Sequence, residues 1–235
     1  MREQEHPIIG GLRLGWHTFA APRPDEEPTD QEEVAFGLWV PDDPDITLDQ
    51  ITQEEFDRSN ERMPYFATIW PSAESLVAEV LAGPAVDGRH ALDLGCGLGP
   101  CGFAAARRCA RVTFFDWEPR ALEIVKASAA EQQTPAAAFD FVVGDWRDPP
   151  PFDPFDIILG ADVLYERRNL LAVAGFLARH LKPGAEAWIT DPGRPQAQQF
   201  PDLAKDEGLD LLDTRLLPPL AANVQITLWR LRQPR

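Results

Sequence analysis

Between Pro71 and the end of the chain, apolar positions recur with helical and strand periods in alternation. Apolar residues at 76, 77, 80 and 81, after a proline and before Gly83, predict a helix over 71–83. The same reading predicts helices over 99–109, 119–131, 167–181 and 196–207, and strands over 90–94, 112–115, 139–143, 155–159 and 185–190. Strands over 209–217 and 223–231 follow with no helical signal between them. Five βα units and a closing hairpin predict an α/β fold, a doubly wound and mostly parallel seven-stranded sheet with an antiparallel C-terminal edge.

The first 63 residues lack this alternation and are predicted to form a separate N-terminal extension, with the main domain over 64–235. Residues 34–40 (VAFGLWV) have the composition of a strand, and residues 10–19 alternate loosely, so the two segments are candidates for a small β element. The segment 20–33 between them is rich in proline and acidic residues, which predicts a flexible loop.

Composition and charge narrow the class of ligand. The formal net charge is −16, and the first 60 residues carry 15 acidic and four basic side chains. Such a surface repels phosphate backbones, so we expect a small molecule or a basic protein segment as partner, and no nucleic acid. No segment has the roughly 20 apolar residues of a membrane helix, and the first residues do not resemble a secretory leader. Three cysteines without a CxxC pair and scattered histidines predict reduced thiols, no metal site and a cytoplasmic location.

The segment HALDLGCGLGPCGF, residues 90–103, places a glycine-rich loop directly after the first strand of the parallel region. Ligands bind such sheets beyond the carboxyl ends of the strands, and glycine lets the backbone approach them closely. Asp116 ends the next strand, where a carboxylate can accept both hydroxyls of a ribose. Asp145 and Trp146 end the third strand, where they can meet the amino group and the face of an adenine. These strand ends predict a nucleoside site.

Two alternatives compete for the same glycines. Gly97, Gly99 and Gly102 also fit the GxGxxG pattern of dinucleotide-binding proteins, with Asp116 about 20 residues further on. The acidic Asp93 would repel a pyrophosphate, and the C-terminal hairpin leaves no second nucleotide-binding half. In the other alternative the glycines only turn the loop.

The pattern Asp-x-Gly-x-Gly-x-Gly, followed by an acid at the second strand end and an acid with an aromatic residue at the third, resembles the class I S-adenosylmethionine-dependent methyltransferases over about residues 64–231. The resemblance implies a Rossmann-like fold and S-adenosyl-L-methionine as cofactor. It implies that the glycine loop accommodates the methionine part and that Asp93 helps position its amino group. The residues expected to contact the cofactor are Trp70, Asp93, Gly95, Cys96, Gly97, Gly99, Asp116, Trp117, Asp145, Trp146 and Ala161.

Two further segments, PYFATIWPSAE at 64–74 and GADVLY at 160–165, are similar to the family 16 methyltransferases, many of which modify protein lysines; bacterial relatives are often labelled nicotinamide N-methyltransferase-like. The resemblance implies that Trp70 lines the cofactor pocket and that Asp162 and Tyr165 are catalytic. A carboxylate such as Asp162 can orient an amine and balance its developing positive charge, and Tyr165 can shape the channel. The structural alternatives are a cap by Asp162 on the helix from Arg167, and packing roles for Tyr165 and Trp70.

The leading hypothesis is therefore an S-adenosylmethionine-dependent N-methyltransferase acting on a protein lysine, as a monomer or small homo-oligomer. A small-molecule methyltransferase, a non-catalytic cofactor-binding protein and an NAD-dependent oxidoreductase are the alternatives. An N-terminal lid over the pocket would favour a small substrate, and an open acidic groove a basic protein segment. The segment 148–152 (DPPPF) resembles a nucleic-acid methyltransferase motif, but it precedes the fourth strand instead of following it.

Overall fold

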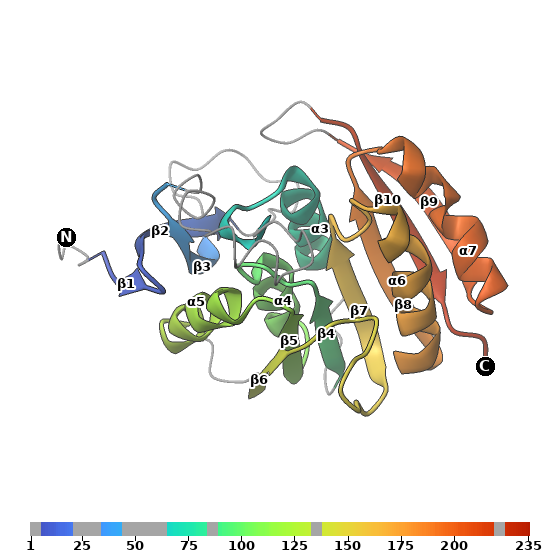
Figure 1. The fold of residues 1–235 in the computed structure, drawn as a ribbon, viewed down its shortest axis with the longest axis horizontal. Coiled ribbons are helices and arrows are strands. Elements are labelled where there is room, and N and C mark those ends of the chain that lie inside the picture. Colours follow the sequence, from blue (N-terminus) through green and yellow to red (C-terminus); the bar gives the residue numbers. More distant parts are fainter. Residues whose placement is uncertain (1–5, 21–33, 44–64, 84–88, 133–137, 219–223) are drawn as a thin grey trace.

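The computed structural model describes residues 6–20, 34–43, 65–83, 89–132, 138–218 and 224–235 (Figure 1). A seven-stranded sheet runs through it in the order β6-β5-β4-β7-β8-β10-β9. The first five strands in this order are parallel, and β10 is antiparallel to both its neighbours, as predicted. The strands are β4 (His90–Leu94), β5 (Arg111–Asp116), β6 (Ala138–Val143), β7 (Phe155–Ala161), β8 (Leu181–Asp191), β9 (Asp210–Leu217) and β10 (Ile226–Arg232).

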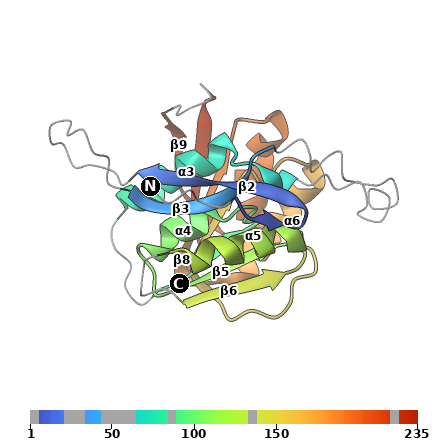
Figure 2. The ribbon, with the colours of Figure 1, turned by 90° about the vertical axis from the view of Figure 1, so that its left-hand side faces the viewer.

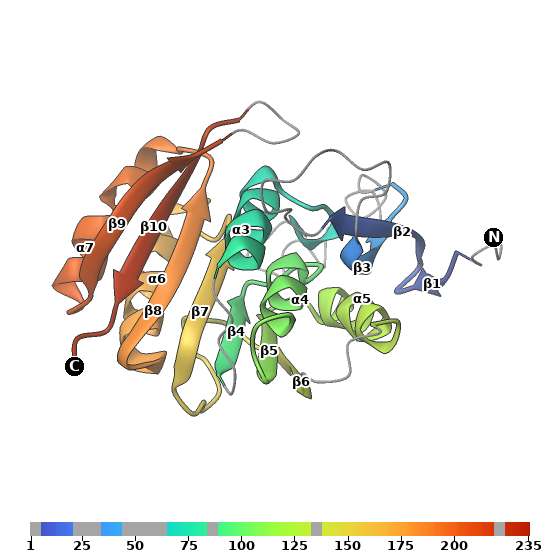
Figure 3. The same cartoon turned by 180° about the vertical axis from the view of Figure 1, so that it is seen from behind.

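Helices cover both faces of this sheet. Figure 3 shows α3 (Pro71–Ala82) and α4 (Pro100–Ala106) in front of it, beside α5 (Pro119–Ala130), with α6 (Arg167–His180) and α7 (Phe200–Asp206) behind. The first three of these helices begin with proline, whose fixed φ suits the first helical position. None of the described helices combines the length and apolar character that a membrane crossing requires.

The connection from β6 to β7 contains no helix, and the sequence analysis predicted none between the strands 139–143 and 155–159. Residues 144–154 form only a bridge between Asp145 and Asp148. Three consecutive prolines, 149–151, lie in this segment, and proline in a helix interior removes a hydrogen bond and clashes with the preceding turn. Four of the five parallel strands are therefore followed by a helix.

The N-terminal residues form a second sheet, as the alternation suggested. Strands β1 (Ile8–Ile9), β2 (Leu12–Ala20) and β3 (Val34–Pro41) pair antiparallel in that order. Figure 2 shows β2 and β3 lying across α4 and α5. The buried backbone N–H of Trp39 donates to Ser128 Oγ at 2.9 Å, and Gln132 donates to the carbonyl of Gly37 at 2.6 Å. The predicted loop, apart from its first residue, and the predicted domain boundary at 63/64 lie outside the described residues.

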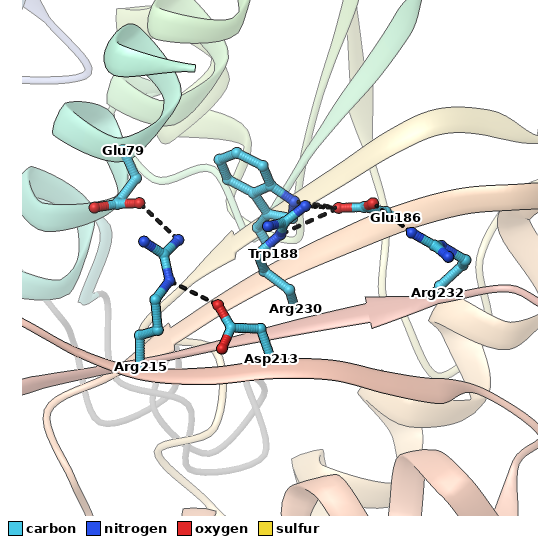
Figure 4. Close-up of polar contacts among 7 residues, drawn as sticks. All are labelled: Glu79, Glu186, Trp188, Asp213, Arg215, Arg230 and Arg232. Carbon is cyan, nitrogen blue, oxygen red and sulfur yellow. Dashed lines mark hydrogen bonds and ion pairs between the residues drawn. The ribbon is translucent and has the colours of Figure 1, made fainter. Parts of the chain in front are cut away.

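Ionic contacts attach the C-terminal hairpin to the rest of the sheet (Figure 4). Glu186 of β8 accepts from Arg230 at 2.7 Å, and the Arg230 guanidinium lies 5.1 Å from the centre of the Trp188 ring. Arg215 of the edge strand β9 reaches Glu79 of α3 at 2.9 Å. The contacts of Arg230 join β10 to β8, and the contact of Arg215 joins β9 to α3.

Candidate functional site

A cavity of about 340 Å³ lies beyond the carboxyl ends of β4, β5 and β7. The order of the strands reverses between β4 and β7, and this is where doubly wound sheets bind their ligands. The segment before α3, the glycine loop and the segments after β5, β7 and β8 contribute to its walls. Eleven of the thirteen predicted site residues line it: Trp70, Asp93, Gly95, Cys96, Gly97, Asp116, Trp117, Trp146, Ala161, Asp162 and Tyr165.

The glycine loop between β4 and α4 has a backbone that other residues rarely adopt. Gly95 and Gly97 have φ angles of +64° and +51°. A Cβ on Gly95 would lie 2.9 Å from Cζ3 of Trp146, so the loop and the indole approach too closely for a side chain. The N–H of Gly97 donates to Asp116 Oδ2 at 2.8 Å, which fixes the loop to the end of β5.

Gly99 and Gly102 are not themselves part of the cavity lining among the described residues, although three of their neighbours are, namely Leu98, Pro100 and Cys101. Gly99 immediately precedes α4. A Cβ on Gly102 would lie 2.2 Å from Cε1 of Phe114, so this glycine lets α4 pack directly on β5. The GxGxxG spacing therefore includes a glycine whose steric role is helix packing.

Two buried carboxyls in the cavity lining, those of Asp93 and Asp116, have raised pKa values. Asp93 is 2% exposed, and burial raises its pKa to about 8, although a 2.7 Å hydrogen bond from the N–H of Gly102 opposes the shift and the nearby Asp116 adds to it. Burial also raises the pKa of Asp116 to about 6, against hydrogen bonds from the N–H groups of Glu118 and Gly97. A nearby cation would favour the charged form of both groups. The ammonium and sulfonium of S-adenosylmethionine supply such cations, so the residues present fit this cofactor.

The two acids predicted to hold the nucleoside are placed differently. Asp116 lines the cavity, and its oxygens accept hydrogen bonds from Gly97 and from the N–H of Glu118 at 2.9 Å. Each carboxylate oxygen has a second lone pair that could accept a hydrogen bond from a ribose hydroxyl. The contact between Asp116 and a ribose stays a prediction. Asp145 lies in an adjoining hollow, where it pairs with Arg147 at 2.6 Å. Its proposed contact with an adenine amino group would have to compete with this ion pair.

Asp162 lies in a buried ionic cluster at the cavity wall. Its φ of +60° is the one positive φ of a non-glycine residue in the described chain, and its N–H donates to the carbonyl of Thr190 at 3.0 Å. Nη1 of Arg194 lies 2.5 Å from Asp162 Oδ1 and 2.9 Å from an oxygen of Asp191. The alternative that Asp162 caps α6 is wrong, because the N-cap residue is Glu166.

The sequence analysis missed several lining residues, including Arg194, Glu118, Glu166 and Tyr65. Arg194 follows β8, and the rule that strand ends carry function could have pointed to it. Tyr65 lies in the segment 64–74, whose resemblance to the family 16 methyltransferases could have pointed to it. It belongs to η1 (Tyr65–Ala67), a single 3-10 turn before α3.

A second cavity, of about 800 Å³, lies near the amino ends of β7 and β8 and contains none of the predicted site residues. Charged side chains in its lining pair with one another, among them Lys182 with Asp156 at 2.8 Å and Arg230 with Glu186 at 2.7 Å. The first cavity is therefore the candidate for cofactor and substrate, although it is the smaller of the two.

Comparisons with known proteins agree with this geometry. Residues 91–184 match the family model described as a methyltransferase domain. The cypemycin N-terminal methyltransferase of a Streptomyces species is 35% identical over 127 residues, which are 52% of this chain and 50% of that protein. The electron transfer flavoprotein beta subunit lysine methyltransferase of Danio rerio is 30% identical over 171 residues, 63% of each chain. The chain thus spans between half and two thirds of the length of these curated relatives.

Solved structures share the fold. The N-methyltransferase NodS from Bradyrhizobium japonicum WM9, in complex with S-adenosyl-l-homocysteine, superimposes with a TM-score of 0.56 at 17% identity, over 79% of this chain and 90% of that one. A structure of the Haloferax volcanii Trm112 methyltransferase activator in complex with a protein assigned as its methyltransferase partner matches with a TM-score of 0.58 at 17% identity, over 83% of this chain and 100% of the matched chain. Residues 91–184 therefore form a methyltransferase domain, and the chain shares the fold of the class I S-adenosylmethionine-dependent methyltransferases.

Proposed function

We propose that the protein transfers a methyl group from S-adenosylmethionine to the side-chain nitrogen of a lysine in a basic protein segment. The observation that carries this proposal is the charge of the cavity lining. Its described ionisable side chains, tyrosines and cysteines aside, are one guanidinium, that of Arg194, and five carboxyls, those of Asp93, Asp116, Glu118, Asp162 and Glu166. Such a lining favours a cationic ligand over an anionic one.

The reaction needs positioning more than it needs a strong acid or base. The bound cofactor would supply a methyl carbon already activated by the sulfonium. The acceptor nitrogen forms its bond to this carbon as the carbon–sulfur bond breaks, so the nitrogen must reach the site as a neutral amine with its lone pair aligned. Asp162 and Tyr165 both line the cavity, and the Asp162 carboxylate can hold the amine and balance the positive charge that develops on it.

Most of the curated relatives with similar sequences support nitrogen as the acceptor atom, although one, the ubiquinone biosynthesis O-methyltransferase of Alkalilimnicola ehrlichii, is named for an oxygen acceptor. The names of several curated relatives specify a lysine or an N-terminus, including the protein N-lysine methyltransferase METTL21A of Danio rerio, 32% identical over 52% of this chain and 58% of that one. The net charge of −16 would attract a lysine-rich segment electrostatically. Both arguments favour a protein lysine over a small neutral substrate.

The test is methyl transfer from isotopically labelled S-adenosylmethionine into a cell lysate that is afterwards separated into protein and small-molecule fractions. We expect label in the protein fraction with the wild type and at least about tenfold less with Asp162→Asn. Asp153→Asn, which changes an exposed carboxylate in the β6–β7 connection, is the matched control and should label like the wild type. Label confined to the small-molecule fraction would contradict a protein acceptor.

A further inference from the structure

Three aromatic rings meet in the lining of the candidate cavity. Tyr65 comes from η1, Trp70 immediately precedes α3, and Tyr165 lies between β7 and α6. The ring centres of Tyr65 and Trp70 are 6.0 Å apart, and those of Tyr65 and Tyr165 are 5.4 Å apart. The interplanar angles are 73° and 67°, so the Tyr65 ring is steeply inclined to each of the other two rings.

These rings are more exposed than three buried carboxyls that line the same cavity, those of Asp93, Asp116 and Asp162. Tyr65 is 44% exposed, whereas Trp70 and Tyr165 are half-buried. The indole N–H of Trp70 donates to the carbonyl of Tyr65 at 2.9 Å, which ties the two residues together. Asp162 lines the same cavity and already shares its carboxylate with Arg194. An acceptor that enters would therefore meet aromatic rings as well as a charged group.

Aromatic rings and carboxylates respond differently to a methylated nitrogen. Each methyl group replaces an N–H and removes a hydrogen bond that Asp162 could accept, but the positive charge of the ammonium remains. The faces of tyrosine and tryptophan attract that charge without needing an N–H, and cages of such rings bind quaternary ammonium groups. The three rings would thus hold the acceptor equally well at every stage of methylation.

We propose that Tyr65, Trp70 and Tyr165 form a subsite for methylated ammonium groups, which retains a partly methylated lysine for further transfers up to the trimethylated state. This rests on the proposed function. Each round consumes one S-adenosylmethionine: a nitrogen–carbon bond forms, the carbon–sulfur bond breaks and S-adenosylhomocysteine leaves. The ammonium loses one proton to solvent before each of the three transfers, and the trimethylated product has no proton left to lose.

The experiment measures binding of Nε-trimethyllysine to the full chain saturated with S-adenosylhomocysteine. The comparison ligand is the analogue in which carbon replaces the quaternary nitrogen, because it has the same shape and no charge. We expect the charged ligand to bind at least about tenfold more tightly, and this preference to survive in Tyr65→Phe and to fall several-fold in Tyr65→Leu. Phe19→Leu, in the N-terminal sheet, is the aromatic control and should bind both ligands like the wild type.

Equal binding of the charged and neutral ligands by the wild type would overturn the subsite, whether or not any variant folds. An unchanged preference in a folded Tyr65→Leu variant would overturn the role of Tyr65. A protein that shows the preference but methylates no amine keeps the subsite and refutes the proposed function. A protein that methylates lysine once and ignores the ligand charge keeps the function and refutes the subsite.

Discussion

The substitution Asp93→Asn tests whether a buried carboxyl beneath the cavity is protonated in the cofactor-free protein. Asn has nearly the same shape, and its amide oxygen can still accept from the N–H of Gly102. The pKa of Asp93 is about 8 in the folded protein, against a usual value of 3.8. A folded-state pKa above the unfolded one means that the folded protein binds the proton more tightly. The contribution of Asp93 to stability is therefore complete below about pH 4 and is lost as the pH rises through 8.

Between these two pKa values, the loss is about 1.4 kcal/mol per pH unit for one proton, or roughly 4 kcal/mol from about pH 5 to pH 8. The Asn variant lacks this titration, while the titration of Asp116, with a pKa of about 6, is present in both proteins and largely cancels in the comparison. The assay is denaturant unfolding of both proteins without cofactor at several pH values. We expect the stability of the wild type relative to the variant to fall steadily with rising pH. Parallel pH profiles would refute a protonated Asp93.

Three further substitutions, and a fourth that serves as a control, test other parts of the site and fold. Asp116→Ala removes the carboxylate that accepts from Gly97 and lines the cavity. Calorimetry should show that the folded variant binds S-adenosylhomocysteine about ten- to a hundredfold more weakly. Unchanged binding would contradict the proposed contact between Asp116 and the nucleoside. Asp162→Asn should lower turnover by about a hundredfold at saturating cofactor and leave cofactor affinity nearly unchanged; full activity would exclude its catalytic role. Ser128→Ala leaves the buried N–H of Trp39 without its acceptor and should cost about 1–3 kcal/mol in denaturant unfolding. Ser72→Ala, at a buried hydroxyl with no partner among the described residues, should cost less.

Most of the parallel sheet could be predicted because its signals are local. Prolines at helix starts and apolar periods set the positions of α3, α5 and β4 to within about two residues. The location of the cavity then followed from topology, since the carboxyl ends of neighbouring parallel strands meet at one edge. The same argument predicted that the glycine loop and Asp116 lie close together, and the hydrogen bond between Gly97 and Asp116 confirms this.

The side-chain pairings could not be predicted in the same way. Arg194 and Asp162 are separated by an entire helix and strand, and their ion pair depends on how the loops after β7 and β8 approach each other. Asp145 has the predicted place at a strand end, but the nearby Arg147 engages its carboxylate. Spacing along the chain places a residue at an edge of the sheet, and the packing of the loops decides which partner its side chain contacts.

The most direct test of the account is to locate the transferred methyl group on the acceptor. The protein fraction labelled with isotopic S-adenosylmethionine would be digested and the labelled peptides fragmented in a mass spectrometer. We predict the label on the side-chain nitrogen of lysine residues, and about a hundredfold less label there with Asp162→Asn. Label on an oxygen, on a nucleic acid or on a small molecule alone would contradict lysine N-methylation as the function of this site.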